Sequence, residues 1–527
     1  MDAHRDQRGA PGQNITAEST WLLAASTTTL DSQARTPTGE FIVADAASAS
    51  TILWQEAKHM AGASTPVILT YLLQYSFGFF NLLVLGHIGA DELAAAALGN
   101  MTLVVVMYSP AIGLASALDT YCSTAFTAAR NKTLVGFHLQ RGLIAMCVQF
   151  LTVAPALWHL ERVLVWLKQD AVVSALCGQY VRAMLLGAPA WMCFECIKRF
   201  LQAQGIMHVS TCILLACLPV HLAASLMLVW SPTVGQGFLG AAYANALTNL
   251  LMLCGIVAYV WRSDVRGAWG GWTVRALYTM PQYFKLAVPS MIMVCSEWWI
   301  LDLLVLAASY LGSTTLAAQS IIVNTCSLTY QVPDGLSIAV CTRVGNLIGQ
   351  ARSRRAKLSA WLGIVVGFAV GLVTLVLCLV IGSWWGRVYS DDRAIVSVVA
   401  HIMPACALFQ MIDAVNSVGS GVLRSLGRQD SGALINFPAY YLVGFPLGIY
   451  LTYGAPRVGV LGLWYGICVG VALAVCLQLA ICMRTRWDDE VGRCMARVLK
   501  DQTSLTGRLD IDVGDDDDDD DSNLLVV

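Results

Sequence analysis

The stretch Leu286–Gly312 reads LAVPSMIMVCSEWWILDLLVLAASYLG and is long and apolar enough to cross a lipid bilayer as one helix. It nevertheless carries two acids, Glu297 and Asp302, although a charge near the centre of a bilayer costs about 2.5–3.5 kcal/mol. Acids in such segments usually face the protein interior and handle ions or substrates. The stretch therefore predicts an integral membrane protein in which buried carboxylates take part in function.

The composition of the whole chain supports a membrane protein. Of its 527 residues, 57% are hydrophobic and only 13% are charged. The 17 cysteines lie mostly in apolar segments, so we interpret them as small, reduced core residues. The net charge of −2 conceals cationic loops, because a run of aspartates at 515–521 offsets them; we interpret this run as a solvated tail.

Twelve windows of about 20 apolar residues, the length that crosses a hydrocarbon core as a helix, follow one another along the chain. They begin near residues 64, 92, 134, 171, 209, 238, 284, 315, 357, 394, 433 and 458. The sequence therefore predicts an all-α membrane protein with twelve transmembrane helices. We divide it into a disordered N-terminal tail (1–63), a first lobe (64–261), a linker (262–283), a second lobe (284–484) and a C-terminal tail (485–527).

The distribution of Lys and Arg predicts which loops face the cytosol. Alternate loops and the C-terminal flank are rich in both, whereas the loops between them hold only Arg162, Lys168, Arg387, Arg393 and Arg457. Positive charge accumulates on the cytosolic side of a membrane protein. We therefore expect both tails in the cytosol, with the chain in the plasma membrane or in a vacuole-like membrane.

Short sequence matches recur in the two halves at a nearly constant offset. Leu93-Ala-Ala-Ala recurs as Leu316-Ala-Ala-Gln, Pro110 as Pro333, and Leu201-Gln-Ala-Gln-Gly205 as Leu423-Arg-Ser-Leu-Gly427. Each half has an even number of predicted helices, so both halves enter the membrane from the same side. The pattern predicts two parallel six-helix repeats around a central cavity, as in many transporters.

Polar residues at helical spacing mark three of the predicted helices. These stripes are Tyr71, Gln74, Gly78 and Asn81; Ser320, Asn324, Ser327 and Gln331; and Gln410, Asp413, Ser417 and Ser420. Residues three or four apart share one face of a helix. We therefore predict that the three stripes line the cavity.

The buried acids have two open interpretations. Glu297 and Asp413 could bind and release a proton, because burial favours the neutral form of a carboxyl group, or a cationic substrate could compete for their charge. Alternatively, the acids could form structural ion pairs with Arg182 or Arg343, which lie well inside predicted helices. We favour the first interpretation for Glu297 and Asp413 and leave both open for Asp302, which lies about 140° around the helix from Glu297.

Several motifs stand out between residues 64 and 484: Gly86-His-Ile-Gly89, Ala117-Leu-Asp-Thr120, Arg199-Phe-Leu-Gln-Ala-Gln204, Glu297-Trp-Trp299, Arg343-Val-Gly-Asn346, Gly421-Val-Leu-Arg424, Tyr440-Tyr441 and Gly462-Leu-Trp464. In this order and spacing they resemble the eukaryotic branch of the multidrug and toxic compound extrusion (MATE) transporters. The resemblance implies an antiporter that exports organic cations and other toxic compounds by alternating access. A proton or sodium gradient would drive it.

The resemblance also implies site residues. The working acids would be Glu297, Asp302 and Asp413, and Trp298, Trp299 and Tyr440 would offer aromatic surface to a cation. Asn324 and Gln410 stand where animal members carry further titratable groups, and Asn81 stands where many prokaryotic members place an Asp. Thr124 and Thr127 replace the usual Gln and Gly of the family, a departure that the sequence alone does not explain.

We expect a monomer whose partners are a small organic cation or amphipathic molecule, a proton or sodium ion, and the lipid bilayer. We expect no cofactor, metal or nucleic-acid site; Cys193 and Cys196 have metal-ligand spacing, but they lie in a predicted span without a second pair. A flippase for lipids or lipid-linked precursors is a second hypothesis. A membrane-embedded enzyme is a third and ranks last, because the sequence shows no nucleophile with a nearby base.

Overall fold

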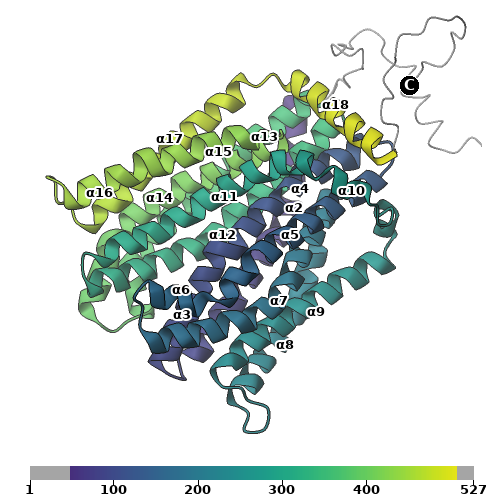
Figure 1. The fold of residues 1–527 in the computed structure, drawn as a ribbon. Coiled ribbons are helices and arrows are strands. Elements are labelled where there is room, and N and C mark those ends of the chain that lie inside the picture. The colour runs from purple at the N-terminus through teal and green to yellow at the C-terminus, as the bar shows by residue number, and fades with distance from the viewer. Residues whose placement is uncertain (1–47, 507–527) are drawn as a thin grey trace, which may run out of the picture.

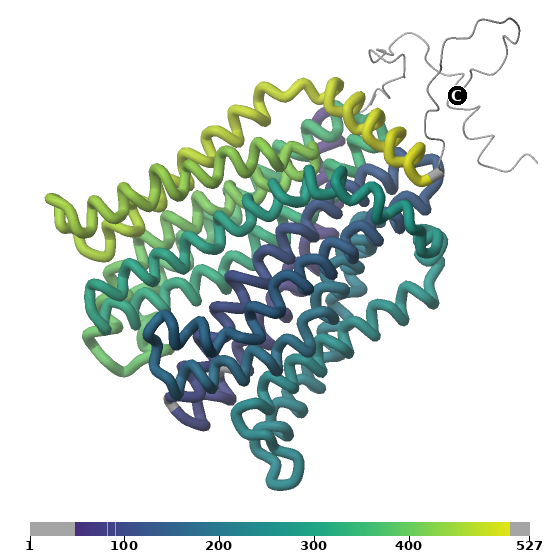
Figure 2. Tube along the Cα trace, in the orientation of Figure 1, coloured from purple at the N-terminus to yellow at the C-terminus, as the bar shows by residue number. Residues whose placement is uncertain are grey.

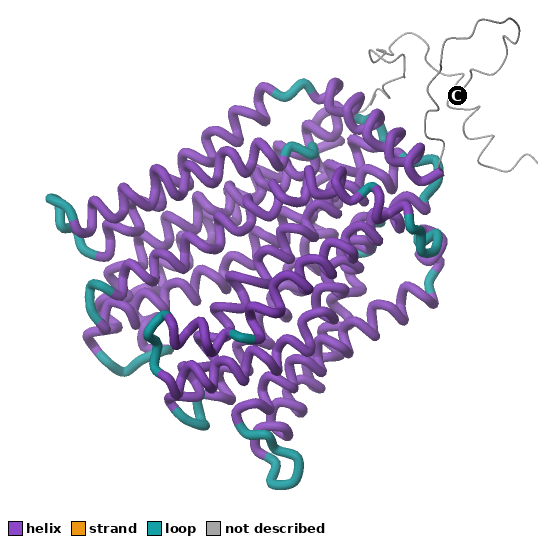
Figure 3. Tube along the Cα trace, in the orientation of Figure 1, coloured by secondary structure: helices purple, strands orange, loops and turns teal. Residues whose placement is uncertain are grey.

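The computed structural model describes residues 48–506, in which helices predominate and no strand occurs (Figures 1 and 3). The first lobe contains α2 (Ala49–Leu85), α3 (Ala90–Leu103), η1 (Val104–Tyr108), α4 (Ser109–Ala128), α5 (Thr133–Trp158), α6 (Leu160–Trp166), α7 (Ala171–Ala203), α8 (His208–Trp230) and α9 (Phe238–Arg262). A connection follows with η2 (Asp264–Ala268) and α10 (Arg275–Tyr278). The second lobe contains α11 (Met280–Ser309), α12 (Ser313–Gly349), α13 (Ser353–Trp385), η3 (Gly386–Val388), α14 (Arg393–Ser425), α15 (Gln429–Pro438), η4 (Ala439–Gly444), α16 (Phe445–Tyr453) and α17 (Val460–Arg484), and α18 (Trp487–Thr506) comes last.

Eleven helical segments of this described part are long and apolar enough to cross a membrane. Three of them are composite, since α3, η1 and α4 run on continuously, as do α15, η4 and α16, and also α13 and η3. The 37-residue α12 is the twelfth segment, and its polar stripe lowers its hydropathy below that of the others. Apart from the first, the segments begin within four residues of the predicted positions.

The first helix corrects one predicted boundary. Residues 1–47 lie outside the described part, but residues 49–63, which we had placed in a disordered tail, form the start of α2. Ile52, Glu56 and Met60 recur every four residues and are at most 2% exposed. Because these residues lie about one turn apart, they form one buried face of the helix. Packing of this face extends the first span beyond the start that hydropathy predicted.

The two lobes repeat one topology. Residues 171–203 form α7 and residues 393–425 form α14, while α9 and α17 cover 238–262 and 460–484, each pair separated by 222 residues. Figure 2 shows the two halves of the chain as two neighbouring groups of helices. The π-helical turns η1 and η4 interrupt different segments, so the repeat is imperfect at these two points.

The described chain begins and ends at one end of the bundle, which we call the tail face (Figure 1). There α18 lies across both lobes. Arg141 of α5 donates from Nη1 to Asp501 Oδ1 (3.2 Å), and Arg428, which follows α14, pairs with Glu490. The helix is therefore held by ion pairs to each lobe.

The lobes meet through α4 against α11 and α12, and through α2 against α12. At one crossing a Cβ on Gly113 would lie 2.4 Å from Met291 Cα, so only glycine permits this approach. Near the tail face, Glu56 of the first lobe accepts hydrogen bonds from Arg343 Nε (2.7 Å) and Arg355 Nε (2.6 Å) of the second. Backbone packing and a buried ion-pair cluster thus join the lobes in this conformation.

Candidate functional site

Glu297 is held inside the second lobe by neighbours from three other elements. Its Oε1 accepts hydrogen bonds from the Tyr330 hydroxyl of α12 (3.1 Å) and from Asn416 Nδ2 of α14 (3.3 Å). Asn416 Nδ2 also donates to the Tyr440 hydroxyl of η4 (2.8 Å). The carboxylate that α11 carries therefore faces hydrogen-bond donors of its own lobe.

Asp413 lies beside Glu297, which makes the two acids a pair. The Asp413 side chain is 4% exposed and interacts directly with both Glu297 and Asn416. Asp413 and Asn416 are three residues apart and so share one face of α14. Two neighbouring carboxyl groups, one buried and one only partly exposed, cannot both be charged cheaply. The arrangement is suited to holding one proton between them, and we call it the acid pair.

Gln478 of α17 supports the acid pair from behind. Its Nε2 donates to Asn416 Oδ1 (3.0 Å), to Asn436 Oδ1 (3.0 Å) and to Ser420 Oγ (3.3 Å). Because the Asn416 oxygen is occupied by Gln478, its NH₂ group is left to face Glu297. Sequence reasoning missed Tyr330, Asn416 and Gln478, although the spacing of Asn416 from Asp413 was a signal that could have identified it.

The other predicted acid and the predicted ion pairs lie elsewhere. Asp302 is partly exposed and interacts with Tyr441 rather than with the acid pair. Arg182 pairs with Glu161 (3.3 Å), and Arg343 pairs with Glu56. The alternative in which these two arginines neutralise the acids of the second lobe is therefore wrong for the described residues.

The predicted aromatic residues do not form one surface. Trp299 points toward the first lobe, where its Nε1 donates to Val105 O (3.1 Å) and Ser109 Oγ (3.1 Å). Tyr440 is 1% exposed and belongs to the acid cluster, while Trp298 is partly exposed. The three rings thus have separate roles, and Trp299 is a contact between lobes.

The two polar stripes of the second lobe also separate. Gln410 and Ser417 of α14 are buried, and Gln410 Nε2 donates to Cys326 O (3.3 Å) within the lobe. On α12, Ser320 and Gln331 are partly exposed, and Asn324 is exposed. The Asn324 carbonyl accepts a hydrogen bond from the Tyr75 hydroxyl of α2 (3.3 Å). The α12 stripe therefore borders the first lobe, whereas the α14 stripe lies inside the second.

The stripe of the first lobe belongs partly to a buried charge cluster. Gln74 Nε2 donates to Glu195 Oε1 (2.9 Å), and Lys198 Nζ lies 2.7 Å from the same oxygen. The Lys198 ammonium also lies 4.5 Å from the centre of the Tyr71 ring. Asn81 is buried apart from these residues and accepts a hydrogen bond from Ser225 (3.2 Å).

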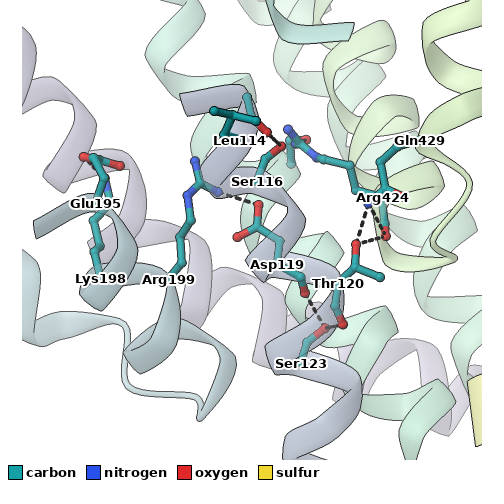
Figure 4. Close-up of polar contacts among 12 residues, drawn as sticks. Leu114, Ser116, Asp119, Thr120, Ser123, Glu195, Lys198, Arg199, Arg424 and Gln429 are labelled. Carbon is teal, nitrogen blue, oxygen red and sulfur yellow. Dashed lines mark hydrogen bonds and ion pairs between the residues drawn. The ribbon is translucent and has the colours of Figure 1, made fainter. Parts of the chain in front are cut away.

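A second buried ion pair lies at the interface between the lobes. Arg199 Nη1 of α7 reaches Asp119 Oδ2 of α4 at 2.5 Å, and the next residue, Thr120, donates to Arg424 O of α14 at 2.5 Å (Figure 4). Although positive charge was expected in the loops, the structure buries Lys198, Arg199 and Arg424 within helices. Lys198 pairs with Glu195 of the same helix, whereas Arg199 is neutralised by Asp119, which is 80 residues away in the sequence.

One further acid, Asp334, was missed although the pattern contained it. Asp334 lies three residues after Gln331 and seven after Ser327, so it continues the polar stripe of α12. It is partly exposed and interacts with Arg424, Arg199 and Lys198. The stripe therefore ends in a carboxylate at the interface between the lobes.

Comparison with known proteins gives matches along most of the chain. The MatE family model matches twice, over residues 66–227 and again over 289–450, which reproduces the internal repeat. An uncharacterized transporter of Schizosaccharomyces pombe is 38% identical over 83% of this chain and 81% of its own length. Multidrug and toxin extrusion protein 2 of Mus musculus is 32% identical over 84% of this chain and 77% of its own. The crystal structure of the eukaryotic MATE transporter AtDTX14 superposes with a TM-score of 0.80 at 26% identity, covering 85% of this chain and 100% of that chain.

Proposed function

Because this chain belongs to the MATE family of transporters, we propose that it is a secondary active antiporter that exports organic cations and other toxic compounds in exchange for protons. The observation that carries the proposal is the acid pair. Glu297 of α11 is partly exposed and lies beside the buried Asp413 of α14, and Glu297 accepts hydrogen bonds from two neutral donors. Such a pair can change its charge by one unit without disturbing the remainder of the core.

The exchange works by competition for one charge. When the pair has lost its shared proton, the site carries excess negative charge, which attracts an organic cation. When a proton binds, the pair loses that charge, and the cation loses its counter-ion. Alternating exposure of the site to the two sides of the membrane then exports the cation as the proton enters.

The donors around Glu297 favour a proton over sodium. The Tyr330 hydroxyl and the Asn416 NH₂ group both direct hydrogens at the Glu297 oxygen. A sodium ion would need oxygen lone pairs instead, and the Asn416 oxygen is already bound to Gln478. The site is therefore better matched to a carboxyl group that gains and loses a proton.

The test uses the purified chain in vesicles with separate pH and sodium gradients and a panel of organic cations. Glu297→Gln and Asp413→Asn should each reduce export driven by the pH gradient by about tenfold or more, because each leaves one side chain that cannot hold the proton. Glu161→Gln, in the partly exposed ion pair with Arg182, is the matched control and should transport normally. Undiminished transport by both acid variants would contradict the proposal. Transport that follows a sodium gradient at fixed pH would show that sodium, and not the proton, is the coupling ion.

The proposal also covers orientation and membrane. The tail face would lie in the cytosol, consistent with the basic loops of the sequence, and the membrane would be the plasma membrane or a vacuole-like membrane. A lipid flippase ranks second. It would need a strongly cationic interface, whereas Lys198 and Arg199 are each paired with an acid.

A further inference from the structure

Asp334 occupies a special place on α12. It follows Pro333, and the next residue, Gly335, touches α2 so closely that a Cβ would lie 2.9 Å from Ile68 Cα. This part of α12 therefore packs closely against α2 of the first lobe, while Asp334 itself is partly exposed. The proposed mechanism assigns no task to this carboxylate, although an acid within a membrane span normally has one.

Charged and titratable groups from helices of both lobes lie within electrostatic range of Asp334. In the first lobe these are Tyr71 of α2, Asp119 of α4, and Lys198 and Arg199 of α7. In the second lobe they are Glu297 of α11, Tyr330 of α12, and Asp413 and Arg424 of α14. Asp334 thus lies within electrostatic range both of the acid pair and of the cationic residues between the lobes.

The helical spacing orders these groups along the membrane normal. Tyr330, which bonds Glu297, precedes Asp334 by one turn, or about 6 Å along α12. Ser337, which accepts a hydrogen bond from Arg424 Nη2 (2.9 Å), follows Asp334 by about 4.5 Å. Asp334 therefore lies between the acid pair and Arg424, on the way to the tail face.

Arg424 adds a second, independent observation. Its side chain is 6% exposed, and its Nε has no hydrogen-bond partner among the described residues. Asp119, the nearby acid of the first lobe, is already bound to Arg199. A buried guanidinium in this position needs a counter-charge, and Asp334 of the same lobe can supply it whenever it is ionised.

We propose that Asp334 relays the proton between the Glu297–Asp413 pair and the tail face. The inference rests on the proposed proton antiport and adds the route by which the proton leaves. The O–H bond of the protonated acid pair breaks, and the proton passes, directly or over water, to the Asp334 carboxylate, which becomes neutral. Asp334 then releases the proton to water at the tail face, and its restored charge again faces Arg424.

The test separates proton movement from substrate movement in vesicles holding the full chain. Asp334→Asn should lower export driven by a pH gradient by about tenfold, while exchange of labelled for unlabelled substrate at equal pH stays within about twofold. Asp334→Glu should recover most of the driven rate, because it keeps an ionisable oxygen. Leu328→Ala, an exposed apolar residue of α12 outside the stripe, is the matched control and should leave the ratio of the two rates unchanged.

Each outcome decides one question. The proposed relay is wrong if the Asp334→Asn variant exports substrate along a pH gradient at the wild-type rate. It is also wrong if the driven rate and the exchange rate at equal pH fall equally. If Asp334→Asn does not fold, as shown by a lost thermal transition, Asp334→Glu with a driven rate no better than background overturns it. A wild-type chain that ignores the pH gradient, or undiminished transport by both Glu297→Gln and Asp413→Asn, would instead contradict the proposed antiport.

Discussion

At the scale of single residues, the site depends on the orientation of amides. Asn416 can help Glu297 only if its NH₂ group faces the carboxylate, and this orientation is imposed by Gln478 from α17. Gly419 makes room for this contact, because a Cβ there would lie 2.4 Å from Gln478 Oε1. Gln478 is therefore a positioning residue that touches neither acid.

We expect Gln478→Leu to weaken both stability and coupling. The variant leaves the oxygens of Asn416 and Asn436 without a donor, and each unsatisfied buried group costs about 1–3 kcal/mol. The thermal midpoint should fall, and the pH profile of driven transport should shift, because Asn416 becomes free to turn its oxygen toward Glu297. The exposed Cys476→Ser on the same helix is the control. An unchanged pH profile at a lowered midpoint would restrict Gln478 to a structural role.

At the scale of helices, glycines decide how closely the lobes approach. Gly349 of α12 faces α4 where a Cβ would lie 2.1 Å from Thr127 Oγ1. Thr127 stands where the MATE family usually has Gly, and this contact accounts for the departure in physical terms: the crossing needs one small partner, and Gly349 provides it. Thr124 donates to the carbonyl of Thr120 (2.7 Å) within α4, so its hydroxyl is satisfied locally.

Gly113→Ala tests the crossing of α4 with α11. The new methyl group would overlap Met291 Cα, which is backbone and cannot rotate away. We expect a loss of stability of about 1–3 kcal/mol from overpacking, measured as a lower thermal midpoint in detergent. Gly62→Ala on α2 meets nothing within 4 Å and should be neutral or slightly stabilising. Equal midpoints for the two variants would show that this crossing tolerates separation.

At the scale of the whole molecule, the cluster at the tail face holds the two lobes together. Glu56 is 0% exposed and binds Arg343 and Arg355, so the first turns of α2 are fastened to α12 and α13. The helix α18 crosses the same face and is joined to both lobes by ion pairs. Alternating access requires these contacts to break whenever the lobes separate at this face.

Glu56→Gln should therefore shift the conformational equilibrium. Removing one partner of a buried ion pair costs about 3–5 kcal/mol, and here the cost falls on the conformation closed at the tail face. Spin labels at the exposed residues Asn131 and Gln350, one on each lobe, should report a larger share of long distances. Glu161→Gln breaks a partly exposed pair within the first lobe, worth about 0–1 kcal/mol, and should leave the distances unchanged. Identical distance distributions for Glu56→Gln and wild type would show that the Glu56 ion pairs do not hold the tail face closed.

Local patterns were sufficient for much of the architecture. Hydropathy identified the spans, since insertion of a helix depends on about 20 consecutive residues. The constant offset between the halves predicted the repeat, and the acids Glu297 and Asp413 stood out against apolar surroundings. The start of α2 was not predicted, because its buried face contains Glu56, whose ion-pair partners are far away in the sequence.

The sequence by itself thus determined the membrane-spanning class, the twelve segments, the two repeats and the presence of carboxylates in them. Only the tertiary structure decided that Glu297 meets Asp413 and Asn416, that Asp302 lies apart, and that Arg343 serves Glu56. The physical reason is the range of the interactions. Helical periodicity and membrane insertion act over neighbouring residues, whereas a buried polar group is satisfied by whichever helix packs against it, here up to 360 residues away.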